Sequence, residues 1–306
     1  MQPGRKLRCA HPLTYPGGGG VNVARVAARL GADVELIYPT GGAAGQLLRR
    51  LVDRESIPNL AIELAEETRE DFTVLEEATG DEYRFVFPGP RFSEKEWRSC
   101  LQTLTALQSP PSFIVASGSL PPGVPADFFA RAARIAKDLK SHFVLDTSGE
   151  ALAAALAEGV YMVKPNLREL RELVGEVDDE VEGIAAAAKE LIGRNQCEVV
   201  AISLGERGAI LVTRNGASFA DAPAVKAVST VGAGDSFLGA LVWGLDAGLA
   251  VEEAFRHGVA AGAAAVLTPG TALSRPADID RLLPAIQIQP ISIGGTPRTK
   301  RGENRR

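Results

Sequence analysis

The chain has 306 residues, of which 45% are hydrophobic, enough to bury the core of one domain of moderate size. Its formal net charge of −5 argues against non-specific nucleic-acid binding as the main role. No run of about 18 apolar residues predicts a membrane span, and the few, widely spaced cysteines fit a reduced compartment, so we expect a cytoplasmic protein without a membrane or nucleic-acid partner.

The first part of the chain predicts extended segments on either side of a glycine-rich loop. Leu7–Leu13 predicts a partly alternating strand, and Pro16–Arg25 then runs four glycines into a helix that begins near Asn22. Phe72–Glu76 and Glu82–Phe87 predict two further strands joined by a short turn. Together, these three extended segments predict a small antiparallel sheet set apart from the main one.

From residue 34 onward, short apolar runs alternate with amphipathic segments of helical period. The runs that predict buried strands are Val34–Tyr38, Phe113–Ala116, Phe143–Leu145, Val160–Val163 and Glu198–Ile202. The segments that predict helices are Gln46–Arg54, Ala126–Leu139, Leu167–Val174 and Val181–Ile192. Such alternation predicts an α/β fold with a mainly parallel sheet, helices on both faces, and ligands at the carboxyl ends of the strands.

A second glycine-rich loop, Thr230–Phe237, predicts the start of another helix. The first turn of a helix leaves about four amides unpaired, and its dipole favours negative charge. Small residues at Gly232, Ala233 and Gly234 let those amides approach a phosphoryl group, and Asp235 stands where it can accept a proton from an attacking hydroxyl. This layout indicates a phosphoryl transferase, while the same residues also fit an ordinary loop whose Asp caps the helix.

Taken as a pair, the two glycine-rich loops resemble the signatures of the PfkB (ribokinase-like) carbohydrate kinases, and the chain resembles most the 6-phosphofructokinases of that family. The resemblance spans most of the chain and implies a kinase domain over residues 6–283. It implies a ribokinase-like three-layer fold whose antiparallel β lid, at about residues 6–14 and 68–88, pairs two copies into a homodimer. Residues 284–306 are rich in Pro, Gly and basic side chains and predict a disordered basic tail.

For catalysis and the sugar phosphate, the resemblance assigns a role to individual residues. It makes Asp235 the catalytic base and the amides of Gly232, Ala233 and Gly234 the anion hole. It implies that the residues in contact with the phosphosugar are Gly17, Gly18, Asn22, Arg69, Arg84, Ser119 and Lys6. Arginine pairs with phosphate through two parallel hydrogen bonds, which suits that role, although each arginine taken alone fits a solvated surface charge.

For the nucleotide, the resemblance implies ATP and Mg²⁺ as cofactors and leaves potassium open as a further one. The implied ATP-binding residues are Lys164, Asn166, Ser203, Gly205, Gly208 and Thr230. Asn166, Glu169 and Asp146 are implied to organise the magnesium ion. Asn166 and Glu169 also fit a capping box, and direct and water-mediated contact with the metal both stay open, because Mg²⁺ keeps several waters.

The chain departs from the family at its start, where the initial strand and its aspartate, which holds sugar hydroxyls, are absent. Because every later motif is intact, we expect that the start given lies downstream of the true one; a damaged kinase is the alternative. Loss of an interior strand is expected to leave backbone groups unpaired.

The resemblance implies ATP-dependent phosphorylation of fructose 6-phosphate to fructose 1,6-bisphosphate. Gly19 stands where 1-phosphofructokinases and tagatose-6-phosphate kinases usually carry Lys, and these two activities are the nearest alternatives. A catalytically dead nucleotide or sugar-phosphate sensor is an alternative of another class. A dinucleotide-binding oxidoreductase is disfavoured, because no strand precedes the first glycine cluster and no well-placed acid follows it.

Overall fold

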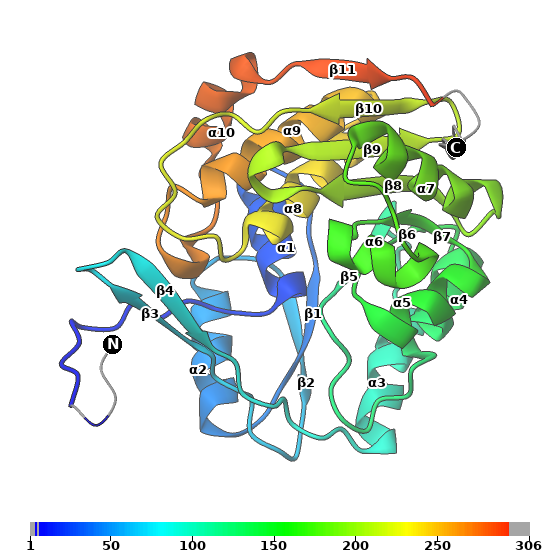
Figure 1. Cartoon of the computed structure of the whole chain (residues 1–306). Coiled ribbons are helices and arrows are strands. Elements are labelled where there is room, and N and C mark those ends of the chain that lie inside the picture. Colours follow the sequence, from blue (N-terminus) through cyan, green and yellow to red (C-terminus); the bar gives the residue numbers. More distant parts are fainter. Residues whose placement is uncertain (1–3, 5, 294–306) are drawn as a thin grey trace, which may run out of the picture.

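The computed structural model describes residue 4 and residues 6–293, and a seven-stranded sheet lies at its centre (Figure 1). The strand order is β11-β10-β9-β8-β7-β6-β5. These strands are β5 (Phe113–Ser117), β6 (His142–Asp146), β7 (Val160–Val163), β8 (Cys197–Ser203), β9 (Ala209–Thr213), β10 (Ala217–Ala220) and β11 (Ile288–Ile291). Pairing is parallel from β5 to β8 and antiparallel from β8 to β11, so the sheet is mixed and the predicted parallel order holds for its first half.

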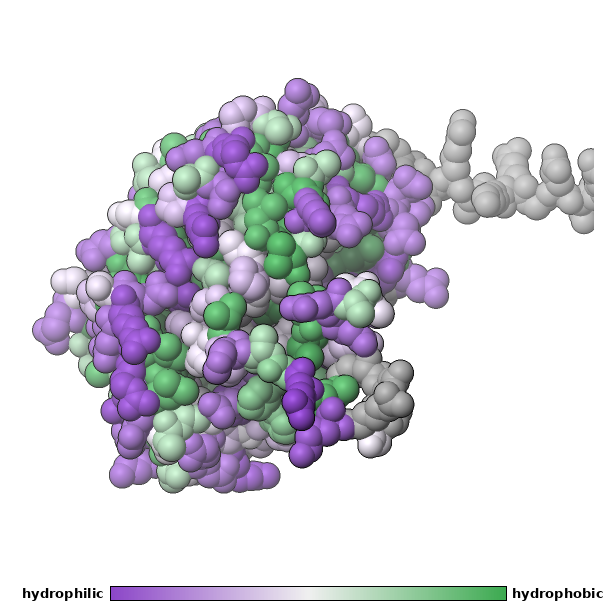
Figure 2. All heavy atoms as spheres, turned by 90° about the vertical axis from the view of Figure 1, so that its left-hand side faces the viewer, coloured by the Kyte–Doolittle hydropathy of each residue, from purple (hydrophilic) through white to green (hydrophobic). Residues whose placement is uncertain are grey.

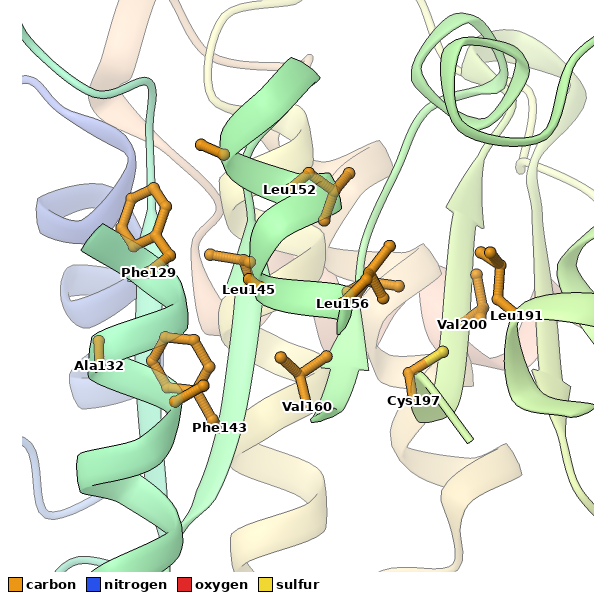
Figure 3. Packing of buried hydrophobic residues seen from close by; sticks show 14 of the residues in the cluster. Phe129, Ala132, Phe143, Leu145, Leu152, Leu156, Val160, Leu191, Cys197 and Val200 are labelled. Carbon is orange, nitrogen blue, oxygen red and sulfur yellow. The ribbon is translucent and has the colours of Figure 1, made fainter. Parts of the chain in front are cut away.

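Helices cover both faces of this sheet, which confirms the three-layer α/β fold. One face is covered by α1 (Gly19–Arg29), α8 (Ala233–Asp246), α9 (Val251–Ala265) and α10 (Pro276–Leu282). The other is covered by α3 (Glu94–Thr105), α4 (Phe128–Asp138), α5 (Gly149–Glu158), α6 (Leu167–Val174) and α7 (Val181–Gly193). In β6, Val144 packs on the first face, whereas Phe143 and Leu145 pack on the second, where Figure 3 shows them among apolar side chains of the covering helices.

A separate two-stranded parallel sheet stands beside the central one. It consists of β1 (Leu36–Thr40) and β2 (Asn59–Glu63), connected through α2 (Gly42–Asp53). Within the described residues neither strand is hydrogen-bonded to β5, the end strand of the central sheet, while α1 contacts both β1 and β5.

A hairpin projects from the body of the protein, as predicted (Figure 1). It consists of β3 (Phe72–Glu76) and β4 (Asp81–Phe85), which pair with each other and with no other described strand. The strand predicted at Leu7–Leu13 is wrong, because residues 6–17 have no regular secondary structure and residues 6–14 are exposed. A lone extended segment with neither a backbone partner nor a buried face gains too little to form a strand.

The predicted tail begins too early. Residues 283–285 form a 3₁₀ turn, and β11 then pairs antiparallel with β10, so these residues belong to the fold. Ile286 is buried, and Pro290 is tolerated because β11 is an edge strand, where one backbone N–H is not needed. The remainder of the predicted tail, residues 294–306, lies outside the described residues. None of the described helices is both long and apolar enough to cross a membrane.

Candidate active site

The start of α8 brings the predicted base into contact with α1. Asp235 lies in the first turn of α8, and the Nδ2 of the buried Asn22 donates a hydrogen bond to its Oδ2 at 2.8 Å. The two residues are 213 positions apart in the chain, so the fold, and not a local motif, places them together. The predicted base therefore has one carboxylate oxygen held by a side-chain amide from the first glycine loop.

Close packing explains why the second loop is built from glycine. Gly232 caps α8 with a φ of 78°, and a Cβ there would lie 2.5 Å from Leu273 Cδ2. A Cβ on Gly234 would lie 3.3 Å from the Nζ of Lys164. The start of α8 and the Lys164 ammonium therefore border the same small space, which suits a transferring phosphoryl group, although the N–H of Ala233 already donates to the oxygen of Thr230 at 3.4 Å.

Two carboxyls and one ammonium dominate the electrostatics of this space. Asp146 ends β6, Lys164 follows β7, and the Lys164 Nζ lies 3.1 Å from Asp146 Oδ2. Burial and, to a smaller extent, the nearby Asp235 together raise the pKa of Asp146 to about 6, against the lowering effect of Lys164. Burial also raises the pKa of Asp235, opposed by the Asn22 hydrogen bond and by the charges of Lys164 and Arg84. A raised carboxyl pKa suits a general base that works near neutral pH.

We expect Lys164→Met to raise the pKa of the Asp146 carboxyl further, because it removes the ammonium 3.1 Å away. A folded-state pKa above the ordinary 3.8 means that the folded protein holds this proton more tightly, so stability falls as pH rises through about 6. The variant should therefore lose more unfolding free energy at high pH than at low pH, measured by urea unfolding at about pH 8 and about pH 5.

Lys189→Met is the matched control, because the Lys189 ammonium donates to the backbone oxygens of Thr213 and Arg214 and, within residues 6–293, to no carboxylate. Its loss should be the same at both pH values. An equal loss of unfolding free energy for Lys164→Met at the two pH values would contradict the interaction assigned between the Lys164 ammonium and the Asp146 carboxyl.

The predicted nucleotide side lies at the carboxyl ends of β7 and β8. Asn166 forms an isolated bridge with Ser203, whose N–H donates to the oxygen of Pro165 at 3.2 Å. A 3₁₀ turn, Gly205–Arg207, connects β8 to β9, and a Cβ on Gly208 would lie 2.0 Å from the oxygen of Ala220. The implied ATP-binding residues of these two segments are thus neighbours; Thr230, by contrast, is exposed just before α8.

The capping box at the start of α6 is present. Asn166 Oδ1 accepts from the N–H of Glu169 at 2.9 Å, and Glu169 Oε2 accepts from the N–H of Asn166 at 3.0 Å. In the described part of the chain no three His, Cys, Asp or Glu side chains gather as a metal site. Asp146 and Glu169 do interact electrostatically, so a magnesium ion here would have few carboxylates and would keep waters.

The predicted sugar side combines the first glycine loop with the hairpin. The N–H of Asn22 donates to the oxygen of Gly18 at 2.9 Å, and Gly18, with a φ of 101°, caps α1. A Cβ on Gly19 would lie 2.2 Å from the Oγ of Ser117 at the end of β5. Arg84 on β4 is close enough for its charge to lower the pKa of Asp235. The exposed Gly17 lies at the open side of the loop.

Three of the residues predicted to bind the sugar phosphate have no described contact with the group around Asp235. Arg69 stands at the base of the hairpin, where its Nη1 donates to the oxygen of Phe87 at 3.5 Å and its Nε lies 3.7 Å from Asp71 Oδ1. Ser119 and Lys6 are exposed, one after β5 and the other ahead of α1. No described contact joins these three side chains to Asp235, so their role stays a prediction.

Two contacts at the site were not foreseen from the sequence. Ser229 Oγ donates to Glu82 Oε1 at 2.7 Å, which ties the hairpin to the loop before α8. The buried Arg25 contacts the side chain of Asn22, and its place three residues after Asn22 on a helix was the available signal.

Comparison with known proteins agrees with this geometry. The model of the pfkB family carbohydrate kinases matches residues 2–278. The chain belongs to this family. It is 43% identical over 295 residues to the ATP-dependent 6-phosphofructokinase isozyme 2 of Mycobacterium tuberculosis, covering 96% of this chain and 86% of that relative. Against the 1-phosphofructokinase of Bacillus subtilis it is 31% identical, covering 92% and 90%.

Solved structures extend the likeness to the fold of this pfkB kinase. Phosphofructokinase-2 from Escherichia coli in complex with substrates and products superposes with a TM-score of 0.89 at 40% identity, covering 93% of this chain and 92% of that one. Arabidopsis thaliana ribokinase complexed with ribose and ATP superposes with a TM-score of 0.70 at 20% identity, covering 92% of each chain. The second likeness shows the ribokinase-like fold alone.

Proposed function

We propose that this pfkB kinase transfers the γ-phosphoryl group of ATP to fructose 6-phosphate and forms fructose 1,6-bisphosphate. The observation that carries the proposal is the hydrogen bond between Asn22 Nδ2 and Asp235 Oδ2, 2.8 Å long, at the glycine-rich start of α8. This hydrogen bond brings the proposed base, Asp235 at the anion-binding start of α8, next to Asn22, which follows the first glycine loop. Phosphoryl transfer needs little more from a protein than positioning and charge stabilisation.

In this proposal, Asp235 accepts the proton of the sugar hydroxyl as the hydroxyl oxygen attacks the γ-phosphorus, the bond from the γ-phosphorus to the β,γ-bridging oxygen breaks, and ADP leaves. The amides of Gly232, Ala233 and Gly234 and the ammonium of Lys164 stabilise the negative charge of the transferring group. The bond from Asn22 leaves the second carboxylate oxygen of Asp235 for the acceptor hydroxyl.

The remaining predicted residues bind substrate and cofactor. Asp146, Asn166 and Glu169 would hold magnesium largely through water; the ion, when bound, offsets the charge of the ATP phosphates. ATP is assigned to the turn at residues 203–208 and to Thr230. The phosphate of the sugar is assigned to Arg84, with Arg69, Ser119 and Lys6 completing the site.

Gly19 supports the choice of fructose 6-phosphate over the substrates of related kinases. A Cβ at this position would lie 2.2 Å from the Oγ of Ser117, so a Lys there requires Ser117 to turn away. The higher identity to a 6-phosphofructokinase than to a 1-phosphofructokinase, 43% against 31%, supports the same choice.

The kinase domain of the proposal begins at residue 6 and includes β11, and its partner is a second copy of the chain. Figure 2 shows apolar surface among the charged side chains on the face that bears the hairpin. Large exposed apolar side chains of the hairpin and its flank are Phe72, Leu75, Phe85, Val86 and Phe87. An isolated hairpin is marginally stable, which favours pairing with another lid. Sedimentation equilibrium at the monomer mass at all concentrations would exclude the dimer.

We expect Arg84→Ala to raise the KM for fructose 6-phosphate by roughly tenfold to a hundredfold, with a smaller effect on the KM for ATP, because a lost charge-assisted hydrogen bond is worth about 1.5–3 kcal/mol. Steady-state kinetics with each substrate varied in turn measures both constants. Arg98→Ala, which removes an exposed i,i+4 ion pair with Glu94 on α3, is the control and should change neither. An unchanged sugar KM in Arg84→Ala removes this residue from the site.

Identification of the product tests the proposed reaction itself. Incubation with MgATP and fructose 6-phosphate should give a ³¹P NMR signal from a new phosphate on C1 beside the original one on C6. ATP hydrolysis without a new sugar phosphate would rule the proposal out.

A further inference from the structure

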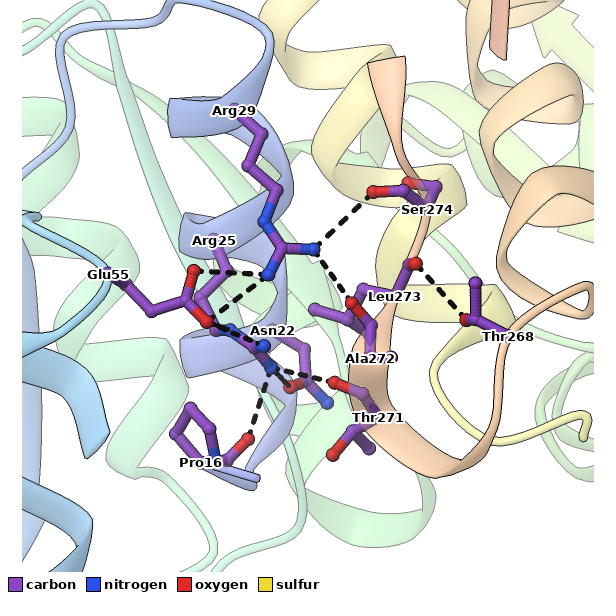
Figure 4. A network of polar contacts seen from close by, with 10 residues as sticks. All are labelled: Pro16, Asn22, Arg25, Arg29, Glu55, Thr268, Thr271, Ala272, Leu273 and Ser274. Carbon is purple, nitrogen blue, oxygen red and sulfur yellow. Dashed lines mark hydrogen bonds and ion pairs between the residues drawn. The ribbon is translucent and has the colours of Figure 1, made fainter. Parts of the chain in front are cut away.

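A cluster of two arginines and one glutamate, in which Arg25 is buried while Arg29 and Glu55 are partly exposed, lies behind the first glycine loop (Figure 4). The side chain of Arg25 is 2% exposed, and its Nε and Nη2 both lie 2.7 Å from Glu55 Oε1. Arg29, one turn further along α1, places its Nη2 3.1 Å from Glu55 Oε2. Burying a guanidinium and a carboxylate costs desolvation free energy that their attraction often fails to exceed. The burial of the Arg25 guanidinium therefore calls for an explanation other than stability.

The third nitrogen of the Arg25 guanidinium contacts Asn22, which holds the proposed base, and two backbone oxygens. Its Nη1 donates to the Oδ1 of Asn22 at 3.4 Å, to the oxygen of Pro16 at 3.3 Å and to the oxygen of Thr271 at 2.9 Å. The contact with Asn22 fixes the orientation of its amide, because a donor on Oδ1 leaves Nδ2 directed at Asp235. A flipped amide would set Oδ1 against the carboxylate, acceptor against acceptor.

The same cluster holds the loop that supports the anion hole. Arg29 Nη1 donates to the oxygen of Ala272 at 2.8 Å and of Ser274 at 3.5 Å. Between them, Leu273 is fully buried with a φ of 65°, a conformation that is unfavourable for a branched residue and needs support from its surroundings. A Cβ on Gly232 would lie 2.5 Å from Leu273 Cδ2, so this side chain packs directly under the start of α8.

We propose that Arg25, held by Glu55, is a positioning residue that aligns Asn22 and Asp235 on one side and the loop under Gly232 on the other. It touches neither substrate and acts through these groups. The proposal rests on the function of Asp235 proposed above. It explains why a guanidinium is buried at this place: Arg25 has several donors in a rigid fork, which one apolar side chain of the same volume cannot replace.

The test replaces Arg25 by Lys, which keeps the charge and loses the fork. We expect Arg25→Lys to lower kcat by about 10²-fold with little change in the KM of either substrate, because misplacement of the reacting groups acts on the chemical step. Arg134→Lys is the matched control, since Arg134 pairs with Glu158 at 2.7 Å on the surface; it should leave kcat unchanged.

A double-mutant comparison separates positioning from a purely structural role. If Arg25 acts through Asn22, then Arg25→Lys should lower kcat much less in an Asn22→Ala protein than in the wild type, while its effect on the urea midpoint is the same in both. An equal loss of kcat in both backgrounds overturns the inference.

A readout that does not need turnover distinguishes this inference from the proposed function. The side-chain amide of Asn22 should give ¹H–¹⁵N signals shifted by its bond to Asp235. We expect Arg25→Lys to move these signals toward those of a solvated Asn, and Arg134→Lys to leave them in place. Unchanged Asn22 signals in Arg25→Lys overturn the positioning role of Arg25, and this result does not depend on whether the wild type phosphorylates fructose 6-phosphate. An inactive wild type counts against the proposed function and not against the positioning role.

Discussion

Replacement of Asp235 by Ala is expected to lower kcat with fructose 6-phosphate by roughly 10²–10⁴-fold while leaving ATP affinity close to that of the wild type. The carboxylate is the proposed acceptor of the hydroxyl proton, and it is held by Asn22 at 2.8 Å. ATP binding is assigned to other segments, at the carboxyl ends of β7 and β8. The loss should therefore fall on the chemical step.

The measurement is steady-state kinetics together with ATP binding by calorimetry. Asp246→Ala is the matched control, because Asp246 is the last residue of the same helix and is exposed. It should change neither kcat nor ATP affinity. Turnover of Asp235→Ala at a rate close to that of the wild type would show that Asp235 is not the base.

Gly232→Ala is expected to have the second largest effect, a fall in kcat of about 10²–10³-fold, as for loss of an anion-hole donor. The added Cβ would lie 2.5 Å from Leu273 Cδ2, and the φ of 78° is unfavourable for alanine. Either the Leu273 side chain or the start of α8 has to shift; because Leu273 is fully buried, we expect the start of α8 and its amides to move.

The other end of α8 offers a control for the backbone strain. Gly248 has a φ of 80°, and a Cβ there would meet nothing within 4 Å. Gly248→Ala should therefore cost about 1–2 kcal/mol of unfolding free energy without an effect on kcat. Urea unfolding and kinetics of both variants separate strain from catalysis. Equal kcat values for Gly232→Ala and Gly248→Ala would contradict the assigned anion hole.

Helices and strands were predicted well where a pattern of neighbouring residues determines them. The strands Phe72–Glu76 and Val160–Val163 and the helix Leu167–Val174 have the predicted bounds. The start of α8 was also recognisable, because Gly and Ala before an Asp form a motif within one helical turn. Asp146 and Lys164 lie at the same edge of the central sheet because β6 and β7 are parallel, so that their carboxyl ends meet there.

What could not be predicted depends on contacts between distant segments. Glu55 meets Arg25 across 30 residues, and Ser229 meets Glu82 across 147, and no periodicity signals either contact. Leu7–Leu13 has a strand-like pattern but no partner strand in the described structure. β11 contains a proline that suggests a loop, and only its pairing with β10 makes it a strand.

The most direct test of the central claim is the rate of ADP release with MgATP and each of three acceptors: fructose 6-phosphate, fructose 1-phosphate and tagatose 6-phosphate. A reaction without sugar and the Asp235→Ala protein serve as blanks. We predict sugar-dependent release with the highest kcat/KM for fructose 6-phosphate. Higher kcat/KM with another acceptor would contradict the assigned substrate, and no sugar-dependent release from a protein that still binds ATP would contradict the assigned reaction and favour a sensor.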